Sequence, residues 1–86
     1  MLTIYSKNNC AFCGHAKTLL TSKNVKFEEI NIENDPAARE FILSEGHRTV
    51  PQIYKNGLLF VEGGFQGLKK LDDEQFQQLA KENNVD

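Results

Sequence analysis

The 86-residue sequence predicts a single α/β domain in which a mixed central sheet carries helices on both faces. Its size and its 40% hydrophobic content suit one small domain with a modest core, which folds without disulfides or metal ions as staples. Strand and helix patterns alternate in the first half, so the first two strands are joined by a crossover helix and should be parallel. In the second half, Asn56-Gly57 between two short apolar runs predicts an antiparallel hairpin. No repeat or linker interrupts residues 1–86, so we expect one domain.

The first strand and the first helix follow directly from residue spacing. Residues Leu2–Ser6 alternate apolar and polar side chains, which is typical of a short strand. A helix should then run from about residue 11 to Lys23, with Asn24 in a left-handed cap. Its buried stripe is expected to consist of Phe12, Ala16, Leu19 and Leu20.

The second strand should span Val25–Ile32, but its apolar residues change phase along the strand. Val25 and Phe27 share one phase, whereas Ile30 and Ile32 share the other. Either a bulge or a strand that is covered on both faces explains this change, and the sequence leaves both open.

A second helix should begin at Asn34-Asp35-Pro36, with Asp35 as the cap and Pro36 in the first helical position. It should continue to about Glu45 and end at Gly46. Its predicted buried residues are Ala38, Phe41 and Ile42. The third and fourth strands are expected at Gln52–Lys55 and Leu58–Val61, on either side of the hairpin turn.

The last third of the chain begins with a break at Gly63-Gly64, after which residues 65–71 are expected to form a short helical turn. Asp72 and Gln75 have the spacing of a capping box for a final helix that ends near Glu82. The buried side of that helix should consist of Phe76, Leu79 and Ala80. Residues 83–86 are expected to fray.

Charge and hydropathy exclude several classes of function. The net charge is −2 and the basic residues are scattered, which argues against a nucleic-acid partner or an anionic membrane surface. No apolar run approaches the roughly 18 residues of a membrane span. Met1 leads directly into the first strand without a signal segment, so a cytoplasmic location is expected. In that compartment, a lone pair of cysteines is more often catalytic or metal-binding than structural.

The only two cysteines form the sequence Cys10-Ala11-Phe12-Cys13, between a strand and a helix. Two thiols at this spacing in a first helical turn can close a disulfide with little backbone movement. The free amides of that turn favour a thiolate, which is the attacking species in disulfide exchange. Cys10 should be exposed and Cys13 more covered. Lys7 and Lys17 add positive charge nearby, although Lys17 is mainly expected to be a solvated helix residue.

Two other interpretations of the cysteines are a structural thiol pair and half of a zinc site. The sequence contains four residues of the types that bind tetrahedral zinc: Cys10, Cys13, His15 and His47. However, His15 lies two residues after Cys13 on a helix and points away from it. His47 has no partner at metal spacing. We therefore favour redox chemistry, expect both histidines to be solvated on the surface, and expect neither a metal nor a tightly bound cofactor.

Three motifs together resemble the glutaredoxin family: the Cys-x-x-Cys after the first strand, Thr49-Val50-Pro51-Gln52, and Gly63-Gly64-Phe65. The resemblance covers about residues 2–71. It implies a thioredoxin-like three-layer α/β/α sandwich with a central four-stranded mixed sheet. It also implies a thiol–disulfide oxidoreductase with glutathione as co-substrate and disulfide-containing proteins as partners. Nothing in the sequence demands a dimer, so a monomer is expected.

The resemblance also implies roles for individual residues. Cys10 would be the nucleophile and Cys13 the resolving cysteine, and the two would form the redox-active disulfide. Pro51 would be cis. Glutathione would contact Lys7 through its glycine carboxylate and Phe12 as an apolar wall. Thr49 would border its site, Val50 would bind it through the backbone, and Pro51 would also contact it. Gly64, Phe65 and Gln66 would hold its γ-glutamyl end. A bridging iron–sulfur cluster is a family alternative with which Cys13 competes.

Three departures from the family pattern bear on the reductant. Ala11 and Phe12 stand where the commonest motif has proline and tyrosine, and Gln66-Gly67 stands where many members have acidic residues. A neutral Gln66 loses a charge-assisted hydrogen bond of about 1.5–3 kcal/mol, which weakens glutathione binding tenfold or more. This departure favours an alternative, a glutaredoxin-like hydrogen donor for ribonucleotide reductase that is reduced by thioredoxin reductase. The complete Gly63-Gly64 and Thr49-Val50-Pro51 motifs favour a true glutaredoxin instead.

Further alternatives outside the enzyme class are a metal-binding module and a redox-inactive interaction domain. Arg39 and Arg48 are candidates for binding a carboxylate, although solvation at the surface is favoured for both.

Overall fold

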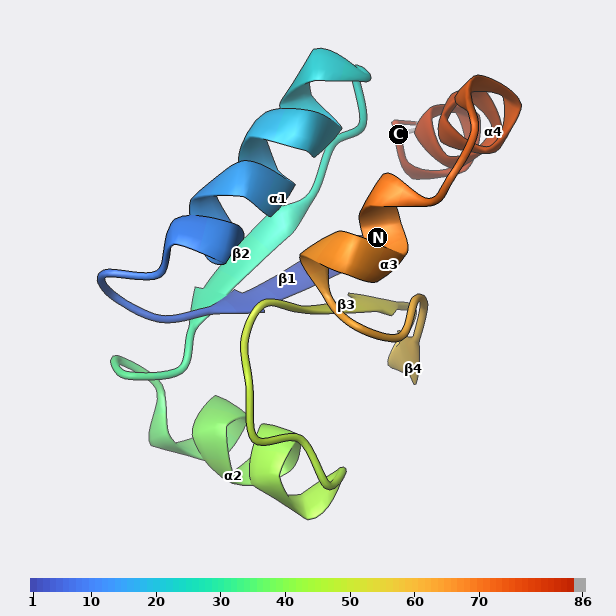
Figure 1. Ribbon diagram of the computed structural model, residues 1–86. Coiled ribbons are helices and arrows are strands. Elements are labelled where there is room, and N and C mark those ends of the chain that lie inside the picture. Colours follow the sequence, from blue (N-terminus) through green and yellow to red (C-terminus); the bar gives the residue numbers. More distant parts are fainter. Residues whose placement is uncertain (85–86) are drawn as a thin grey trace.

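The computed structural model describes residues 1–84 and contains four strands and four helices (Figure 1). The strands are β1 (Leu2–Ser6), β2 (Glu28–Asn31), β3 (Gln52–Lys55) and β4 (Leu58–Leu59). The helices are α1 (Ala11–Ser22), α2 (Pro36–Ser44), α3 (Phe65–Lys69) and α4 (Asp73–Asn83). Within residues 1–84, no helix combines the length and apolar character that crossing a membrane requires.

The strands form one mixed sheet in the order β2-β1-β3-β4. β1 pairs with β2 in parallel and with β3 antiparallel, and β3 pairs antiparallel with β4. Figure 1 shows α2 on one side of the sheet and α1 and α3 on the other. The predicted three-layer α/β/α arrangement around a four-stranded mixed sheet is therefore confirmed.

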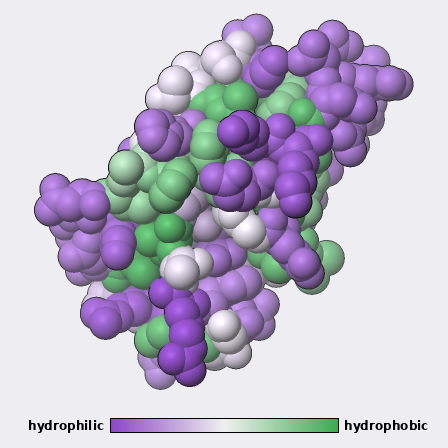
Figure 2. Space-filling model, viewed as in Figure 1, coloured by the Kyte–Doolittle hydropathy of each residue, from purple (hydrophilic) through white to green (hydrophobic). Residues whose placement is uncertain are grey.

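The main core lies between the sheet and helices α1, α3 and α4. Leu2 and Ile4 of β1 and Ile53 of β3 are fully buried there, as the alternation of each strand requires. The helices and the segment before β2 complete this core with Ala16, Leu20, Val25, Leu68, Phe76 and Leu79. Figure 2 shows the surface in the same view, with hydrophilic residues at both ends of this face and exposed apolar residues between them.

A second, aromatic cluster lies between the sheet and α2. Tyr5 and Tyr54 meet edge to face with ring centroids 5.5 Å apart. Phe41 of α2 lies 5.7 Å from Tyr5 and 5.3 Å from Tyr54. Phe41 is only half-buried, whereas the other two predicted residues of this helix, Ala38 and Ile42, are buried as expected. These aromatic pairs add to the stability that burial alone provides.

The second strand is shorter than predicted, and its shorter span explains why the apolar residues of Val25–Ile32 change phase. β2 begins at Glu28 rather than Val25, and its register against β1 is continuous from Thr3↔Glu28 to Ser6↔Asn31. Val25 and Phe27 pack on the α1 side. The uninterrupted register excludes a bulge within the strand, and the strand is not covered on both faces, because Glu28 and Glu29 are exposed. The phase changes because Val25 and Phe27 precede the strand, whereas Ile30 lies within it.

The predicted turns and caps are confirmed. Asp35 caps α2 by accepting from Ala38 N at 3.0 Å, with Pro36 in the first turn. Asn56 and Gly57 both have positive φ, 52° and 84°, as the hairpin turn requires. The capping box of Asp72 and Gln75 is present at the start of α4.

Three element ends differ from prediction. β4 ends at Leu59 rather than Val61, and α3 ends at Lys69 rather than residue 71. The C-terminal residues 83 and 84 do not fray: Asn83 is buried, and its amide donates to Leu79 O at 2.7 Å. Asn84 bonds to Lys26 N and Asn24 O, which ties the end of α4 to the segment before β2. The same prediction for residues 85–86 lies outside the described residues.

Candidate active site

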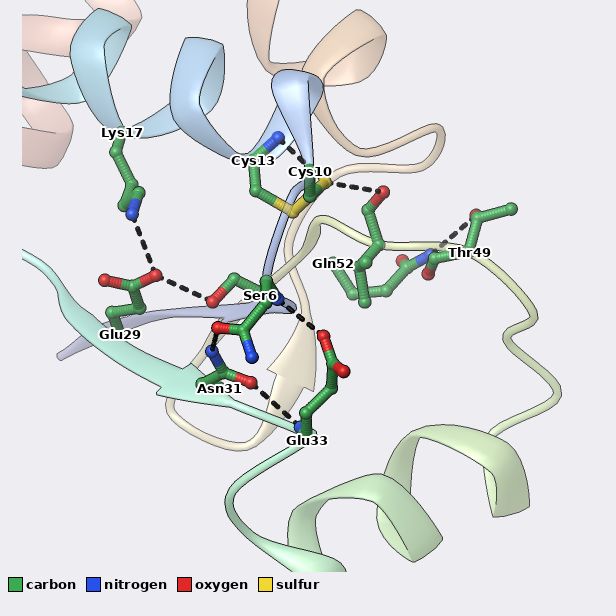
Figure 3. Close-up of a disulfide and its surroundings, with 11 residues drawn as sticks. Ser6, Cys10, Cys13, Lys17, Glu29, Asn31, Glu33, Thr49 and Gln52 are labelled. Carbon is green, nitrogen blue, oxygen red and sulfur yellow. Dashed lines mark hydrogen bonds and ion pairs between the residues drawn. A yellow bond between two sulfur atoms is a disulfide. The ribbon is translucent and has the colours of Figure 1, made fainter.

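Cys10 and Cys13 are joined by a disulfide at the start of α1, with their Cα atoms 5.2 Å apart (Figure 3). Cys10 is the N-cap residue, and the backbone N–H of Cys13 donates to Cys10 Sγ at 3.2 Å. In the reduced protein this donor and the helix dipole favour a thiolate on Cys10. Cys13 is 2% exposed, whereas Cys10 is only partly buried. The predicted difference in accessibility between the two cysteines is confirmed.

The loop before β3 faces the disulfide. The carbonyl oxygen of Val50 lies 3.8 Å from Cys10 Sγ, and the Val50–Pro51 peptide is cis, as the resemblance implied. The buried side chain of Gln52 holds this loop, because its amide donates to Thr49 O at 2.9 Å and also reaches Thr49 Oγ1 at 3.4 Å. Gln52 belongs to the Thr49-Val50-Pro51-Gln52 motif, but the sequence did not predict that its side chain holds the loop in place.

Gly64 brings the start of α3 against the cis-proline segment. Its φ is 58°, and a Cβ at this position would overlap the carbonyl oxygen of Pro51 and lie 3.4 Å from the carbonyl carbon. Only glycine therefore allows this approach without strain. The consequence is that α3 packs against the loop that faces the disulfide, and that Phe65 of α3 reaches Phe12 of α1.

A cavity of about 220 Å³ opens between α1, α3 and the loop before β3. It is lined by Phe12, Thr49, Val50, Pro51, Gly63, Phe65 and Gln66. Six of these seven residues were predicted to contact glutathione. Phe12 is 54% exposed and stacks on Phe65 at 6.0 Å, so its predicted burial in the helix stripe is wrong. No carboxylate lines this cavity.

A second cavity, of about 290 Å³, shares Thr49 and Val50 with the first and is rich in positive charge, although the carboxylate of Glu33 also lines it. Lys7, Arg39 and Arg48 line it. The ion pairs found among the described residues involve other lysines, so these three cations are available to a ligand. The arginines are exposed, as expected, but they converge with Lys7 instead of being scattered.

The two histidines have different surroundings. His15 is exposed and its ring lies 5.6 Å from Phe65 and 5.9 Å from Phe12. His47 is half-buried and its Nε2 lies 2.8 Å from Tyr54 Oη, so the prediction of a solvated histidine is wrong there. Among residues 1–84, no three histidine, cysteine, aspartate or glutamate side chains are placed to hold a metal ion.

A small polar network lies beneath the disulfide (Figure 3). Ser6, which is 1% exposed, donates to Glu29 Oε2 at 2.7 Å, and Lys17 Nζ lies 2.9 Å from the same oxygen. The charge of Lys17, which was expected to assist Cys13, is therefore paired. The network was not predicted, although the alternation Leu2, Ile4, Ser6 places Ser6 on the buried side of β1.

We expect this network to make stability depend on acid pH. The hydrogen bonds from Ser6 and from Lys17 lower the pKa of Glu29 below its ordinary value. A lowered pKa in the folded state stabilises the fold at neutral pH, and this contribution is lost as pH falls through the folded pKa. Glu29→Gln should therefore weaken the loss of stability below about pH 4.5. Urea unfolding from pH 7 to pH 3 measures this, and an acid limb identical to wild type would contradict it.

Comparison with known proteins gives consistent results. The family model described as Glutaredoxin matches residues 2–60. The glutaredoxin-like protein NrdH of Lactococcus lactis is 40% identical over 60 residues, covering 70% of this chain and 83% of the relative. Glutaredoxin 3 of Escherichia coli is 48% identical over 52 residues, covering 59% of this chain and 63% of that protein.

Solved structures agree on the fold. The wheat glutaredoxin structure matches with a TM-score of 0.77 at 26% identity, over 98% of this chain and 81% of that one. The NrdH-redoxin of Escherichia coli, whose structure is described as the basis of a thioredoxin-like activity profile, matches with a TM-score of 0.69 at 27% identity. That match covers 91% of this chain and 92% of the other. The predicted thioredoxin-like fold is therefore confirmed.

Proposed function

Because this chain belongs to the glutaredoxin family of thiol–disulfide oxidoreductases, we propose that it reduces protein disulfides and glutathione mixed disulfides with glutathione as the reductant. The observation that carries the proposal is the position of Cys10 Sγ, 3.8 Å from the Val50 carbonyl. Val50 and Thr49 line both cavities. We call the one that contains Lys7, Arg39 and Arg48 the cationic cavity, and the one that contains Phe12 and Phe65 the aromatic cavity. A short peptide thiol can extend across both while its sulfur meets Cys10.

The first step is attack by the Cys10 thiolate on one sulfur of the substrate disulfide. The substrate S–S bond breaks, a mixed disulfide forms on Cys10, and the released thiolate takes up a proton. The Cys13 N–H that now donates to Cys10 Sγ stabilises the thiolate before attack. Cys10 serves as the nucleophile because it is the more accessible of the two cysteines.

In the second step, Cys13 loses its proton and attacks Cys10 Sγ. The mixed disulfide breaks, the second substrate thiol leaves, and the Cys10–Cys13 disulfide remains. Two glutathione molecules then restore the dithiol and leave as glutathione disulfide. Because this cycle needs a reduced glutathione pool, we place the protein in the cytoplasm.

Glutathione has charged groups at both ends, and the two cavities suit them unequally. Lys7, Arg39 and Arg48 offer positive charge to the glycine carboxylate. At the other end, the backbone N–H of Gln66 already donates to Gly63 O at 3.1 Å. We therefore expect the γ-glutamyl group to depend on the N–H groups of Gly64 and Phe65 and on the side chain of Gln66.

A second candidate is a hydrogen donor for ribonucleotide reductase that thioredoxin reductase reduces. It is favoured by the absence of a carboxylate in the aromatic cavity and by the exposed stack of Phe12 on Phe65. An apolar stack beside the disulfide suits a protein surface better than the ammonium group of glutathione. The similarity to proteins named NrdH also supports this candidate.

A coupled assay separates the two candidates. One arm contains glutathione, glutathione reductase and NADPH, and the other contains thioredoxin reductase and NADPH. We expect turnover in the glutathione arm, and Gln66→Glu should lower the KM for glutathione about tenfold by pairing with its ammonium group. Gln77→Glu, the same charge change on the exposed side of α4, is the control. Turnover with thioredoxin reductase alone would overturn the proposal in favour of the second candidate.

A further inference from the structure

The end of α2 fixes the backbone of the residue that begins the loop before β3. Gly46 N donates to Leu43 O at 3.0 Å, and His47 N donates to Ile42 O at 3.1 Å. Gly46 has a φ of 85°, which is the left-handed conformation that closes a helix in this way. His47 therefore stands at a defined point, three residues before Val50.

The side chain of His47 extends a hydrogen-bond chain into the protein. Its Nε2 lies 2.8 Å from Tyr54 Oη, and Tyr54 Oη lies 3.3 Å from Glu45 Oε1. Since a carboxylate only accepts, the tyrosine hydroxyl donates to Glu45 and accepts from an N–H on His47 Nε2. The chain of bonds thus runs from His47 through Tyr54 to Glu45, and each donor has an acceptor.

The central group of this chain is held rigidly. Tyr54 is 2% exposed and is part of β3. Its ring meets Tyr5 and Phe41 edge to face at 5.5 and 5.3 Å, and the ring of His47 stands perpendicular to it at 5.9 Å. The phenol oxygen is therefore a fixed point on the sheet, to which His47 is attached.

The loop is thus anchored to β3 at two places. Tyr54 binds His47, the first residue of the loop, and Gln52 binds Thr49 through two contacts of its amide. Arg48 lies between the two anchored residues and lines the cationic cavity, as His47 does, and Thr49 lines both cavities together with Val50. Neither anchor lies among the cysteines, so the anchors influence the substrate surface without touching the reacting sulfurs.

We propose that His47 is a positioning residue, whose hydrogen bond to Tyr54 holds Thr49 and Val50 in the conformation that binds the substrate beside Cys10. The inference deepens the proposed function and rests on it only in part, because the same loop faces Cys10 whichever reductant is used. Loss of this bond should loosen the loop and raise KM. It should leave kcat nearly unchanged, since Cys10 keeps its donor from Cys13.

The test removes the hydroxyl group of one tyrosine at a time. Tyr54→Phe deletes the bond and keeps the ring, whereas Tyr5→Phe is the matched control in the same cluster, because no side-chain hydrogen bond of Tyr5 is found among the described residues. Tyr54→Phe and His47→Ala should each raise KM about fivefold to tenfold, the factor that one ordinary hydrogen bond supplies, with kcat within about twofold of wild type. His47→Gln, which keeps an N–H donor, should restore part of the loss.

Backbone NMR relaxation gives a readout that does not depend on activity. In Tyr54→Phe and His47→Ala, the order parameters of residues 48–50 should fall from about 0.85 towards 0.6, while those of β3 stay unchanged. Unchanged order parameters in both variants would overturn the inference, as would an equal effect of Tyr5→Phe or a fall in kcat at constant KM. If the wild-type protein is inactive with glutathione, the proposed function fails, and the order parameters still decide the role of His47.

Discussion

Replacement of Cys10 by serine is expected to abolish disulfide reduction. Cys10 is the partly exposed sulfur at the N-cap of α1, and Cys13 is buried beneath it. Serine is a far weaker nucleophile at neutral pH, so turnover should fall by on the order of 10³-fold or more. The two-arm coupled assay measures this with either reductase. Substantial residual turnover would show that Cys10 is not the nucleophile.

Replacement of Cys13 by serine is the matched control for that experiment. This variant cannot form the intramolecular disulfide, so it should lose the reduction of protein disulfides that depends on a dithiol. It should keep the reduction of glutathione mixed disulfides, in which a second glutathione attacks the adduct on Cys10. Loss of both reactions in Cys13→Ser would contradict the division of roles between the two cysteines.

Gly67→Ala should be the most destabilising single change at a glycine. A Cβ on Gly67 would overlap the carbonyl oxygen of Glu62 and lie 2.9 Å from the carbonyl carbon and 3.2 Å from Val61 Cβ. Backbone atoms cannot move aside as a flexible side chain can, so α3 must shift. We expect a loss of about 3 kcal/mol in the free energy of unfolding, and a melting temperature about 15 °C lower.

Gly14→Ala tests whether this effect is local. Gly14 lies in α1, and an added Cβ would meet nothing within 4 Å. Alanine should therefore stabilise the helix by about 0.5–1 kcal/mol. Urea unfolding of both variants measures the difference, and equal stability of the two proteins would contradict the packing of α3 described above.

Local signals explain why most of the fold was predictable. Asp35-Pro36, Asn56-Gly57 and the Asp72/Gln75 box each fix a turn or a helix start through nearby backbone groups, and the structure confirms all of them. Phe12 shows the limit of such signals. Its spacing along α1 matches a buried stripe, but its partner Phe65 comes from α3, and the two rings stack at the edge of a cavity.

The candidate site was predictable where residues lie within motifs, and not where distant segments meet. The cysteines and the loop before β3 follow from their motifs. The convergence of Lys7 with Arg39 and Arg48 depends on how α2 packs against the sheet. The bond of His47 to Tyr54 likewise depends on the alternation of β3 and the end of α2, which together bring two residues seven positions apart into contact.

Trapping the glutathione adduct tests the central claim most directly. The Cys13→Ser protein, in which Cys10 is the only cysteine, is mixed with glutathione disulfide, and intact-mass spectrometry follows the reaction beside Cys10→Ser. We predict rapid addition of one glutathionyl group to Cys13→Ser and a far slower reaction of Cys10→Ser, whose remaining thiol is buried. An unmodified Cys13→Ser protein, or faster addition to Cys10→Ser, would contradict the claim that Cys10 is the nucleophile of a glutathione-dependent oxidoreductase.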